Sequence, residues 1–375
     1  MIASLSLKNF KCFQNLESIN LGRINLFTGS NGRGKSTFLQ SLLLLAQSMD
    51  SEKRLNHIEL NGRFIELGTF DDVRCQYSKS GDPTIIFTTD DEEENNLTIT
   101  FAKYRDKQRW AKLVRLNSSG KELVEETGSA TGADSNKDNK DTRVLGATST
   151  ISGLTQLHNV YFISADRKGP IDYIKKNDNG DDRQIGIHGE YLINSLSRKG
   201  EKFTQSVALE ASKILSGATV LVNDTETDYL QFYLDSEDNS KGFRPSNVGF
   251  GYSYVLPIIT TMLLAERGAK VFVENPEAHL HPGAQSRLIE FLIKYSTEKE
   301  IQLFIETHSD HIINGLRIAV SKEKLDKQKA HIIHFNRKLF QSPEVYQIKI
   351  DGKGNLSDYP EGFMDEWGAQ MSQLV

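Results

Sequence analysis

The chain opens with short stretches in which apolar and polar residues alternate or form a brief apolar run. SLSLKNF (4–10), ESINL (17–21) and RINLFTG (23–29) therefore each predict a β-strand. The next segment, STFLQSLLLLAQSM (36–49), has the wide apolar face of a deeply buried helix. Between about residues 83 and 117, three more alternating stretches predict antiparallel strands joined by turns. The first third of the chain is thus expected to be rich in strands, with one buried helix.

The pattern changes in the second half of the chain. A helical insertion is expected over about 170–218, and residues 219–235 predict a hairpin. Apolar stretches then alternate between helix and strand spacing: helix 251–266, strand 270–274, helix 283–296, strand 301–306 and helix 309–320. This alternation predicts a parallel sheet with crossover helices. No sustained heptads occur, so we expect no long coiled coil.

Two segments lack apolar periodicity. Gly128–Asp141 is small and polar throughout, which predicts a mobile loop, and the acidic run Asp90–Asn96 predicts a solvated turn. Composition is that of an ordinary globular protein, with 375 residues, 38% hydrophobic residues and a formal net charge of -5. This charge excludes a uniformly basic surface for nucleic acid but leaves local basic patches open.

Cysteine usage and hydropathy bear on the compartment. Only Cys12 and Cys75 are present, too few for a disulfide framework, and this indicates a reducing cytoplasm. The opening residues have no long apolar stretch of the kind found in a signal peptide. The longest apolar run, Leu42–Ala46, is far below the roughly 20 residues of a membrane span. We therefore expect a cytoplasmic protein with no membrane contact.

The segment GSNGRGKST fits the phosphate-loop pattern G-x-x-x-x-G-K-[ST], with a predicted strand before it and a predicted helix after it. Glycines let the backbone curl so that successive N–H groups point at phosphate oxygens, and Lys35 adds a charge at the terminal phosphates. The Ser36 hydroxyl can ligate Mg²⁺. The cofactors expected here are ATP and Mg²⁺. The predicted nucleotide contacts are Gly29, Ser30, Asn31, Gly32, Arg33, Gly34, Lys35, Ser36 and Thr37.

A phosphate loop also needs a carboxylate on a neighbouring strand to hold the metal. The strand KVFVE ends in Glu274, which with Ser36 forms the predicted Mg²⁺ site. A second apolar strand, LFIETHSD, brings His308 to its end. This place resembles the one where ABC-type ATPases carry a histidine, and that resemblance implies that the His308 ring reaches the γ-phosphate. A competing interpretation takes HSDH (308–311) and HLH (279–281) as a dinuclear metal centre. Such a centre normally needs a histidine at the position of Glu306, which disfavours it.

These motifs, in this order, resemble those of the OLD/RecF/SMC-like branch of ABC-type ATPases, and in particular stand-alone prokaryotic AAA-family ATPases. FVENPEAHLHP (272–282) and THSDH (307–311) carry the resemblance, and LKNFKCF (7–13) and LNGRFIELGTFDDV (60–73) add to it. The resemblance implies an α/β ABC-type P-loop ATPase head with a mixed core sheet.

The same resemblance implies a division of the chain. It predicts an ATPase domain over 1–345 and a short C-terminal segment over 346–375. The domain would contain an antiparallel β subdomain near residues 60–120 and a helical lid insertion.

The resemblance further implies a homodimer that sandwiches two ATP molecules, with a higher oligomer left open. Each phosphate loop would face the signature loop of the other copy. The candidate signature is NVGFGYSYVLPII (247–259), in which Gly251 and Ser253 would approach a γ-phosphate. Gly249 stands where the signature serine is expected, and no Q-loop glutamine is identified.

Water activation is the open point of the sequence. The family pattern D-E-P-E becomes Glu274-Asn275-Pro276-Glu277, and an asparagine cannot accept a proton from water. Glu277 is the alternative candidate base. One hypothesis is therefore a slow ATPase whose ATP-bound dimer regulates a partner. Another is an ATP-gated scaffold that scarcely hydrolyses, and a third is a DNA repair clamp that resembles RecF.

The partner is predicted from the length of the chain. A Toprim nuclease domain does not fit into the residues after about 340, so we expect a separate effector protein, a nuclease or similar, as in anti-phage or DNA-repair systems. Direct DNA contact stays open at two basic turns, Ala165–Pro170 and Arg198–Lys202, although exposed basic loops more often bind neither DNA nor a partner.

Overall fold

The computed structural model describes most of the chain. The described residues are 1–78, 80–90, 96–104, 109–119, 121–124, 152–177, 183–215, 217, 219–224, 226–235, 242–336 and 342–374. The predicted mobile loop 128–141 and most of the predicted acidic turn lie outside them. Backbone contacts divide the chain into a first unit (Met1–Leu21, Ser36–Asn159, Arg337–Glu344) and a second unit (Gly22–Lys35, Val160–Asn336, Val345–Val375). The predicted single ATPase domain over 1–345 stays a prediction.

The first unit is built on an antiparallel sheet. Its order is β2 (Phe13–Asn20), β1 (Ile2–Phe10), β5 (Thr84–Thr89), β6 (Asn96–Ala102), β7 (Trp110–Ser118) and β4 (His57–Glu59), and β8 (Lys121–Val124) pairs with β7. Alternate residues such as Ile85, Phe87 and Ile99 are fully buried. This is the period of a strand that has one face against a core, and the predicted strands are confirmed.

The described residues of the first unit form three helices. They are α1 (Lys35–Ser48), whose first residue closes the second unit's phosphate loop, α2 (Phe70–Val73) and α3 (Ser152–Thr155). The apolar run Leu42–Ala46 of α1 is at most 1% exposed at every position. The deep burial that the wide apolar face of this helix predicts is therefore confirmed.

The second unit contains the parallel sheet that the sequence predicts. The strand order is β16 (Glu344–Ile348), β15 (Ala330–Asn336), β3 (Ile24–Thr28), β14 (Gln302–Glu306), β13 (Lys270–Glu274) and β9 (Val160–Ile163). From β15 to β9 each neighbouring pair is parallel. The carboxyl ends of β3, β14 and β13 therefore meet at one edge of the sheet, which is where loops of α/β proteins form binding sites.

Both faces of this sheet are buried, which explains its continuous apolar runs. One face contributes side chains such as Val273 and Ile305 to the main hydrophobic cluster of the unit. The other face carries stacked phenyl rings. Phe272 and Phe304 lie 4.4 Å apart between ring centroids at an interplanar angle of 6°, and Phe27 follows at 6.4 Å from Phe304. These rings pack the three strands that end at the candidate site.

The helices of the second unit are α4 (Leu192–Lys199), α5 (Glu201–Leu215), α6 (Phe250–Leu264), α7 (Pro282–Glu298), α8 (Asp310–Ser321) and α9 (Glu366–Met371), with short turns η1 (Pro245–Asn247) and η2 (Lys327–Lys329). A small antiparallel sheet has the order β10 (Tyr173–Lys175), β12 (Tyr229–Asp235), β11 (Thr219–Asp224).

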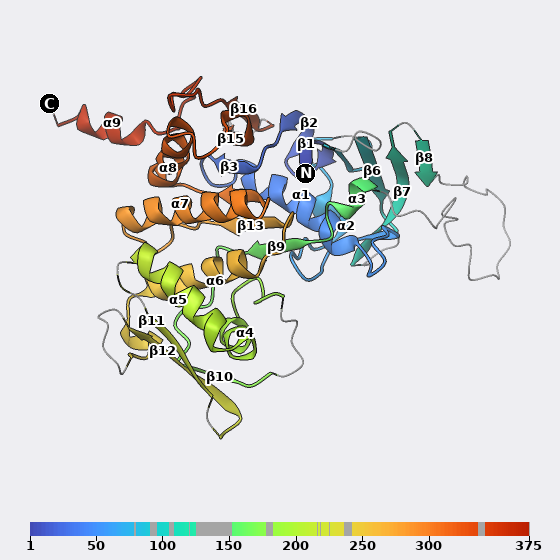
Figure 1. The fold of residues 1–375 in the computed structure, drawn as a ribbon. Helices are drawn as coiled ribbons and strands as arrows, with labels where there is room; N and C mark the ends of the chain where they lie inside the picture. Colours follow the sequence, from blue (N-terminus) through green and yellow to red (C-terminus); the bar gives the residue numbers. More distant parts are fainter. Residues whose placement is uncertain are drawn as a thin grey trace, which may run out of the picture. The chain divides into compact units, whose positions relative to one another are not determined.

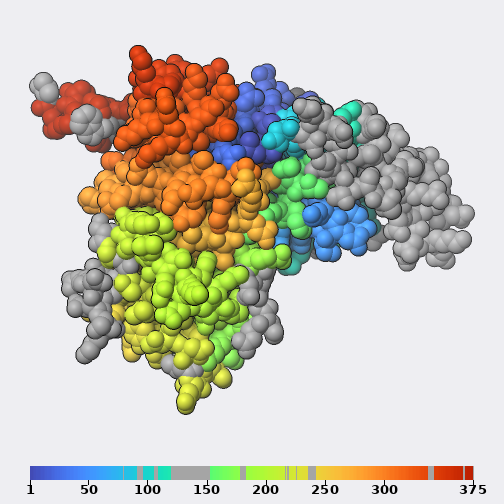
Figure 2. Space-filling view, viewed as in Figure 1, coloured from blue at the N-terminus to red at the C-terminus, as the bar shows by residue number. Residues whose placement is uncertain are grey.

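Within this unit, α7 and β13 lie between the small sheet with α4 and α5 on one side and α8 with β15 on the other (Figure 1). The surfaces of α5 and α7 adjoin (Figure 2).

The predicted elements from 219 to 320 are confirmed, with small shifts at their ends. The region 170–218, expected to be a helical insertion, contains α4 and α5 but also the strand β10. Helix α7 begins one residue earlier than predicted, at Pro282, because proline suits the first helical turn, and the His281 Nδ1 accepts a hydrogen bond from the Gly283 N–H at 3.2 Å. Helix α8 begins after Ser309, whose hydroxyl accepts from the N–H groups of His311 and Ile312. No helix among the described residues combines the length and hydropathy that a membrane crossing requires.

Candidate nucleotide-binding site

The phosphate loop follows β3 at the carboxyl edge of the parallel sheet. Gly29, Gly32 and Gly34 have φ values of 122°, 72° and 112°. Residues with a side chain adopt such positive φ values only with backbone strain, whereas glycine adopts them readily. A Cβ on Gly29 would also lie 2.1 Å from the carbonyl oxygen of Phe335, closer than any contact allows. The curl of the loop therefore requires glycine at these positions, which is the backbone reason for the motif.

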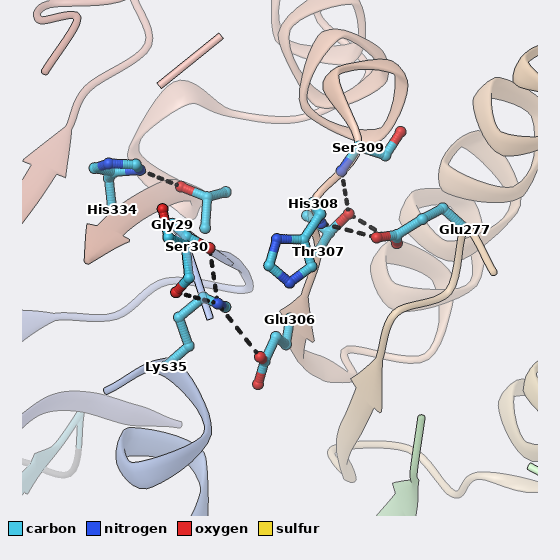
Figure 3. A network of polar contacts seen from close by, with 10 residues as sticks. Gly29, Ser30, Lys35, Glu277, Glu306, Thr307, His308, Ser309 and His334 are labelled. Atoms are coloured by element: carbon cyan, nitrogen blue, oxygen red, sulfur yellow. Dashed lines mark hydrogen bonds and ion pairs between the residues drawn. The ribbon is translucent and has the colours of Figure 1, made fainter. Parts of the chain in front are cut away.

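Lys35 closes the loop on itself. Its Nζ donates to the carbonyl oxygens of Gly29 at 2.7 Å and Ser30 at 3.0 Å, and it lies 3.7 Å from Oε1 of Glu306 (Figure 3). The Lys35 side chain is only 3% exposed. Burial lowers the pKa of the Lys35 ammonium, and the nearby Glu306 carboxylate opposes that shift. A bound anion would add negative charge at this buried ammonium and favour its charged form.

Two glutamates end adjacent strands, and they face different partners. Glu274 and Glu306 are register partners across β13 and β14. The Glu306 carboxylate faces Lys35, whereas Oε2 of Glu274 accepts from the N–H of Ala165 at 3.0 Å and the hydroxyl of Ser164 at 3.4 Å. Glu274 is thus held at the end of β9. Sequence analysis noted Glu306 only as an argument against a metal centre and missed its ion pair with Lys35.

The predicted metal ligands fall in both units. Glu274 lies in the second unit, and Ser36 and Thr37 open the first-unit part of α1. A carboxylate and a hydroxyl are oxygen donors of the kind that Mg²⁺ prefers. Among the described residues, no group of three or more His, Cys, Asp or Glu side chains is placed to hold a metal ion. The Mg²⁺ site at Ser36 and Glu274 stays a prediction.

Asn275 has a backbone reason for its identity. Its φ is 44°, in the left-handed region that asparagine tolerates better than most side chains. Its N–H donates to the carbonyl oxygen of Glu306 at 2.8 Å, which links the ends of β13 and β14. Its side-chain Oδ1 is buried and has no hydrogen-bond partner. A glutamate here would carry its longer side chain on the same strained turn.

Glu277 connects the two loops that follow β13 and β14. Its carboxylate accepts from the Thr307 hydroxyl at 2.8 Å and from the His308 N–H at 2.8 Å (Figure 3). The Thr307 hydroxyl in turn accepts from the Ser309 N–H at 3.1 Å. Both carboxylate oxygens of the predicted alternative base therefore hold the segment that carries His308.

His308 has an exposed side chain next to Lys35. Partial desolvation lowers the pKa of its imidazole, the charge of Lys35 lowers it further, and Glu277 opposes both effects. Figure 3 shows the ring on the side of Lys35 and Glu306, with Glu277 on the other side. The lowered pKa favours the neutral imidazole, and the ring lies on the side of Lys35. The predicted contact of His308 with a γ-phosphate stays a prediction.

Gln285 is a residue that sequence analysis missed. Its Oε1 accepts from the Ser309 hydroxyl at 2.5 Å, and its Nε2 donates to the carbonyl oxygen of Leu280 at 2.8 Å. It fastens the HLH turn before α7 to the start of α8. The only sequence signal was its place one turn into a helix that follows the strand-end motif.

Arg167 is the second missed residue, and within the charged turn Ala165–Pro170 it is buried, whereas Lys168 of the same turn is exposed. The Arg167 side chain is 2% exposed, so it is not available to DNA or to a partner. The guanidinium instead donates to the carbonyl oxygens of Glu274 at 2.8 Å and Asn275 at 2.6 Å. DNA contact through the rest of this turn, and at the basic stretch Arg198–Lys202, stays a prediction.

The candidate signature segment opens α6. Gly249 is the residue before the helix, and Phe250 is 51% exposed. A Cβ on Gly251 would lie 2.9 Å from the carbonyl oxygen of His279, so this glycine permits α6 to approach the HLH turn. The side chain of Ser253 is buried, at 9% exposure. The predicted contacts of Gly251 and Ser253 with a second copy's nucleotide stay predictions.

We expect the second unit to lose stability as the pH falls below about 6.5, the ordinary pKa of histidine. His334 is 2% exposed, and its Nδ1 lies 3.0 Å from the Thr28 hydroxyl. Burial chiefly lowers the pKa of His334, so the unfolded chain binds a proton that the folded chain refuses. The free energy of unfolding therefore rises with pH across this window.

The measurement is the urea midpoint of unfolding at about pH 7.5 and about pH 5.5. His334→Asn keeps a polar group near Thr28 but does not titrate, so its midpoint should fall less than that of the parent. Part of the pH dependence will persist, because the pKa values of His308 and His331 are lowered as well. An equal fall in both proteins would contradict the assignment.

Two family models match the chain. Residues 24–314 match the family described as "AAA domain, putative AbiEii toxin, Type IV TA system". Residues 327–374 match a protein family of unknown function, DUF3696. No curated protein matches.

Among solved structures, the chain is similar to an SMC head bound to the C-winged helix domain of ScpA, with 15% identity and a TM-score of 0.55 over 93% of this chain and 98% of that chain. It is also similar to an SMC head domain with an extended coiled coil bound to the C-terminal domain of ScpA derived from Pyrococcus furiosus. That match has 12% identity and a TM-score of 0.52 over 100% of this chain and 99% of that chain.

At these identities the solved structures show the fold alone. The predicted fold class, an α/β ABC-type P-loop ATPase head with a mixed core sheet and an antiparallel sheet, is confirmed. The first family model spans well over half of the 375 residues and includes the phosphate loop, Glu274 and His308. The chain therefore belongs to the AAA-domain family that bears this description.

Proposed function

We propose that this protein is an ATP-binding head that closes on a second copy around ATP, hydrolyses the nucleotide slowly and thereby regulates a separate partner. The observation that carries the proposal is the buried Lys35 ammonium inside a loop of left-handed glycines. A triphosphate would meet the charge of Lys35, the N–H groups of the curled loop and the N-terminus of α1. Glu274 and Ser36 would hold Mg²⁺, which neutralises phosphate charge when bound.

Slow turnover is supported by the residue after Glu274. Asn275 can hydrogen-bond a water molecule but cannot accept its proton, and Glu277 is engaged by Thr307 and His308. The alternative of an ATP-gated scaffold that does not hydrolyse rests on the same two observations. Steady phosphate release above that of a Lys35→Ala control separates the two functions.

Asn275 provides a test of whether this position sets the rate. Asn275→Gly accommodates φ 44° without strain and should keep ATP binding and turnover within about threefold of the parent. Asn275→Glu should not create a fast ATPase, because the left-handed turn costs a glutamate about 1 kcal/mol and misplaces its carboxylate. Phosphate release by the three proteins is the measurement. A rate increase of about tenfold or more in Asn275→Glu would contradict this expectation and make the missing carboxylate the cause of slow turnover.

A second copy and a separate effector are the proposed partners. The SMC heads of similar fold are bound to domains of ScpA, which supports the idea that a head of this shape acts through another protein. The family description names a putative AbiEii toxin of a type IV TA system. A role in defence, with a separate nuclease or similar effector, is part of the proposal. A clamp resembling RecF would instead bind duplex DNA by itself in the presence of ATP.

The decisive experiment is the mass of the purified protein in solution with Mg²⁺ and ATP, with ADP, and without nucleotide. We expect a dimer with ATP and a monomer without it, together with ATP binding measured by calorimetry. A protein that binds no ATP would overturn the proposal. A protein that binds ATP but stays monomeric would retain the nucleotide site and refute the sandwich.

A further inference from the structure

Arg167 is a buried cation that none of the nucleotide motifs includes. It lies four residues after the end of β9 and is 2% exposed. Its Nη1 donates to the carbonyl oxygens of Glu274 at 2.8 Å and Ser164 at 3.2 Å, and its Nη2 donates to the carbonyl oxygen of Asn275 at 2.6 Å. The guanidinium therefore bridges the loop after β9 to the last residue of β13 and the first residue of the turn that follows it.

The contact between these two loops is reciprocal. The Glu274 carboxylate accepts from the Ala165 N–H at 3.0 Å, while the Glu274 carbonyl accepts from Arg167. The Asn275 carbonyl belongs to the residue whose φ is 44°. The two donors of the Arg167 guanidinium bind the carbonyl oxygens of successive residues, Glu274 and Asn275, and so hold Asn275 in its left-handed conformation. A lysine ammonium, a point charge, cannot present two donors in fixed planar directions.

The other side of Arg167 contacts α6. Its guanidinium carbon lies 5.3 Å from the centre of the Tyr254 ring, a cation–π distance. The Tyr254 ring in turn lies 4.4 Å from the His279 ring on the HLH turn. Burial lowers the pKa of Arg167 to about 10, against the opposing effects of Glu277, Tyr254 and Glu274, so the group is charged at neutral pH. Arg167 thus contacts both the predicted signature helix and the strand-end turn.

We propose that Arg167 is a positioning residue that holds the Glu274–Asn275 turn in its working geometry and joins it to α6. It touches neither phosphate nor metal in this role. It acts through Glu274, the predicted metal ligand, and through the turn that leads to Glu277 and so to Thr307 and His308. The effect on turnover rests on the proposed ATPase function, whereas the effect on the turn does not.

Hydrogen exchange of the nucleotide-free protein tests the positioning directly. Three backbone hydrogen bonds protect this turn from exchange. The N–H of Asn275 donates to the carbonyl oxygen of Glu306, that of Ala278 to the carbonyl oxygen of Asn275, and that of Leu280 to the carbonyl oxygen of Glu277. In Arg167→Ala, a peptide covering residues 274–281 should exchange about tenfold faster, because charged donors to two carbonyls are lost. A peptide within α8 should be unchanged. Unchanged exchange at 274–281 would overturn the proposal, whatever the turnover.

Turnover supplies the second readout, with Arg167→Lys as the conservative variant. We expect kcat of Arg167→Ala to fall by about tenfold with the KM for ATP within about threefold, and Arg167→Lys to recover part of the loss. The control is Arg267→Ala, which removes an exposed arginine paired with Glu300 and should behave like the parent. An unchanged kcat in Arg167→Ala, or full recovery by lysine, would contradict positioning by the two donors of the guanidinium.

The two proposals fail in different ways. A parent protein that binds no ATP refutes the ATPase function, and the exchange experiment still decides the role of Arg167. A parent that binds and hydrolyses ATP, with normal exchange in Arg167→Ala, refutes only the positioning role. If Arg167→Ala does not fold, the exchange experiment is done on Arg167→Lys. Faster exchange at 274–281 than in the parent supports positioning by the two guanidinium donors, and parent-like exchange overturns it.

Discussion

Lys35→Ala is expected to weaken ATP binding by about a hundredfold and to abolish measurable phosphate release. Removing a charged donor from a buried anion site costs about 3 kcal/mol, which corresponds to roughly that factor in the dissociation constant. The Lys35 side chain is 3% exposed, and its ammonium donates hydrogen bonds to the carbonyl oxygens of Gly29 and Ser30. The measurement is ATP binding by calorimetry, with phosphate release alongside.

The matched control is Lys322→Ala, which removes an exposed lysine at the end of α8 in the same unit. It should bind ATP as the parent does. Circular dichroism and thermal unfolding of both variants show whether the fold persists, since Lys35→Ala also leaves Glu306 without its ion pair. Parent-like ATP affinity in Lys35→Ala would place the nucleotide elsewhere and refute the site.

Substitution of Glu277 is expected to lower kcat strongly, and the size of the loss separates a positioning role from a general-base role. If the carboxylate mainly holds Thr307 and His308, then Glu277→Ala should lower kcat by about a hundredfold, because two hydrogen bonds to a charged acceptor are lost together. Glu277→Gln keeps one oxygen acceptor and should lose only about tenfold. A general base cannot be replaced by an amide, so equal losses in the two variants would identify Glu277 as the base.

The pH profile gives an independent check on the same question. A base at Glu277 would make the parent's kcat depend on a carboxylate ionisation, and that dependence would vanish in Glu277→Gln. A positioning role leaves the shape of the profile unchanged and lowers its height. ATP affinity of both variants should stay within about threefold of the parent, because Glu277 contacts the His308 segment and not the phosphate loop. A loss of affinity equal to the loss of kcat would contradict both roles.

The candidate site lies at the carboxyl edge of the parallel sheet, where contacts join neighbouring strand ends. Three neighbouring strand ends carry the predicted site residues: the phosphate loop follows β3, Glu274 ends β13 and His308 follows β14. Glu277 joins the last two, Lys35 and Glu306 join the first to β14, and Arg167 joins β13 to β9. Hydrogen bonds and one ion pair of charged groups therefore connect the ends of β9, β13, β14 and β3.

The sequence by itself determined the features that are encoded within a short window. The spacing of glycines and Lys35 in residues 29–37 specifies the loop, because its curl depends on φ values that glycine alone adopts easily. Apolar periodicity predicted the helices and strands from 251 to 320, since each period repeats within a few residues. The position of Asn275 also marked the open question of turnover before any contact was known.

Only the tertiary structure decided which side chains face one another. Glu277 meets Thr307 across 30 residues of sequence, and Arg167 meets Asn275 across 108. Such pairs depend on which strands are neighbours and in what register, and a local pattern contains neither. The left-handed backbone of Asn275, the burial of Arg167 and the ion pair of Lys35 with Glu306 arise for that reason from the packing of distant strand ends.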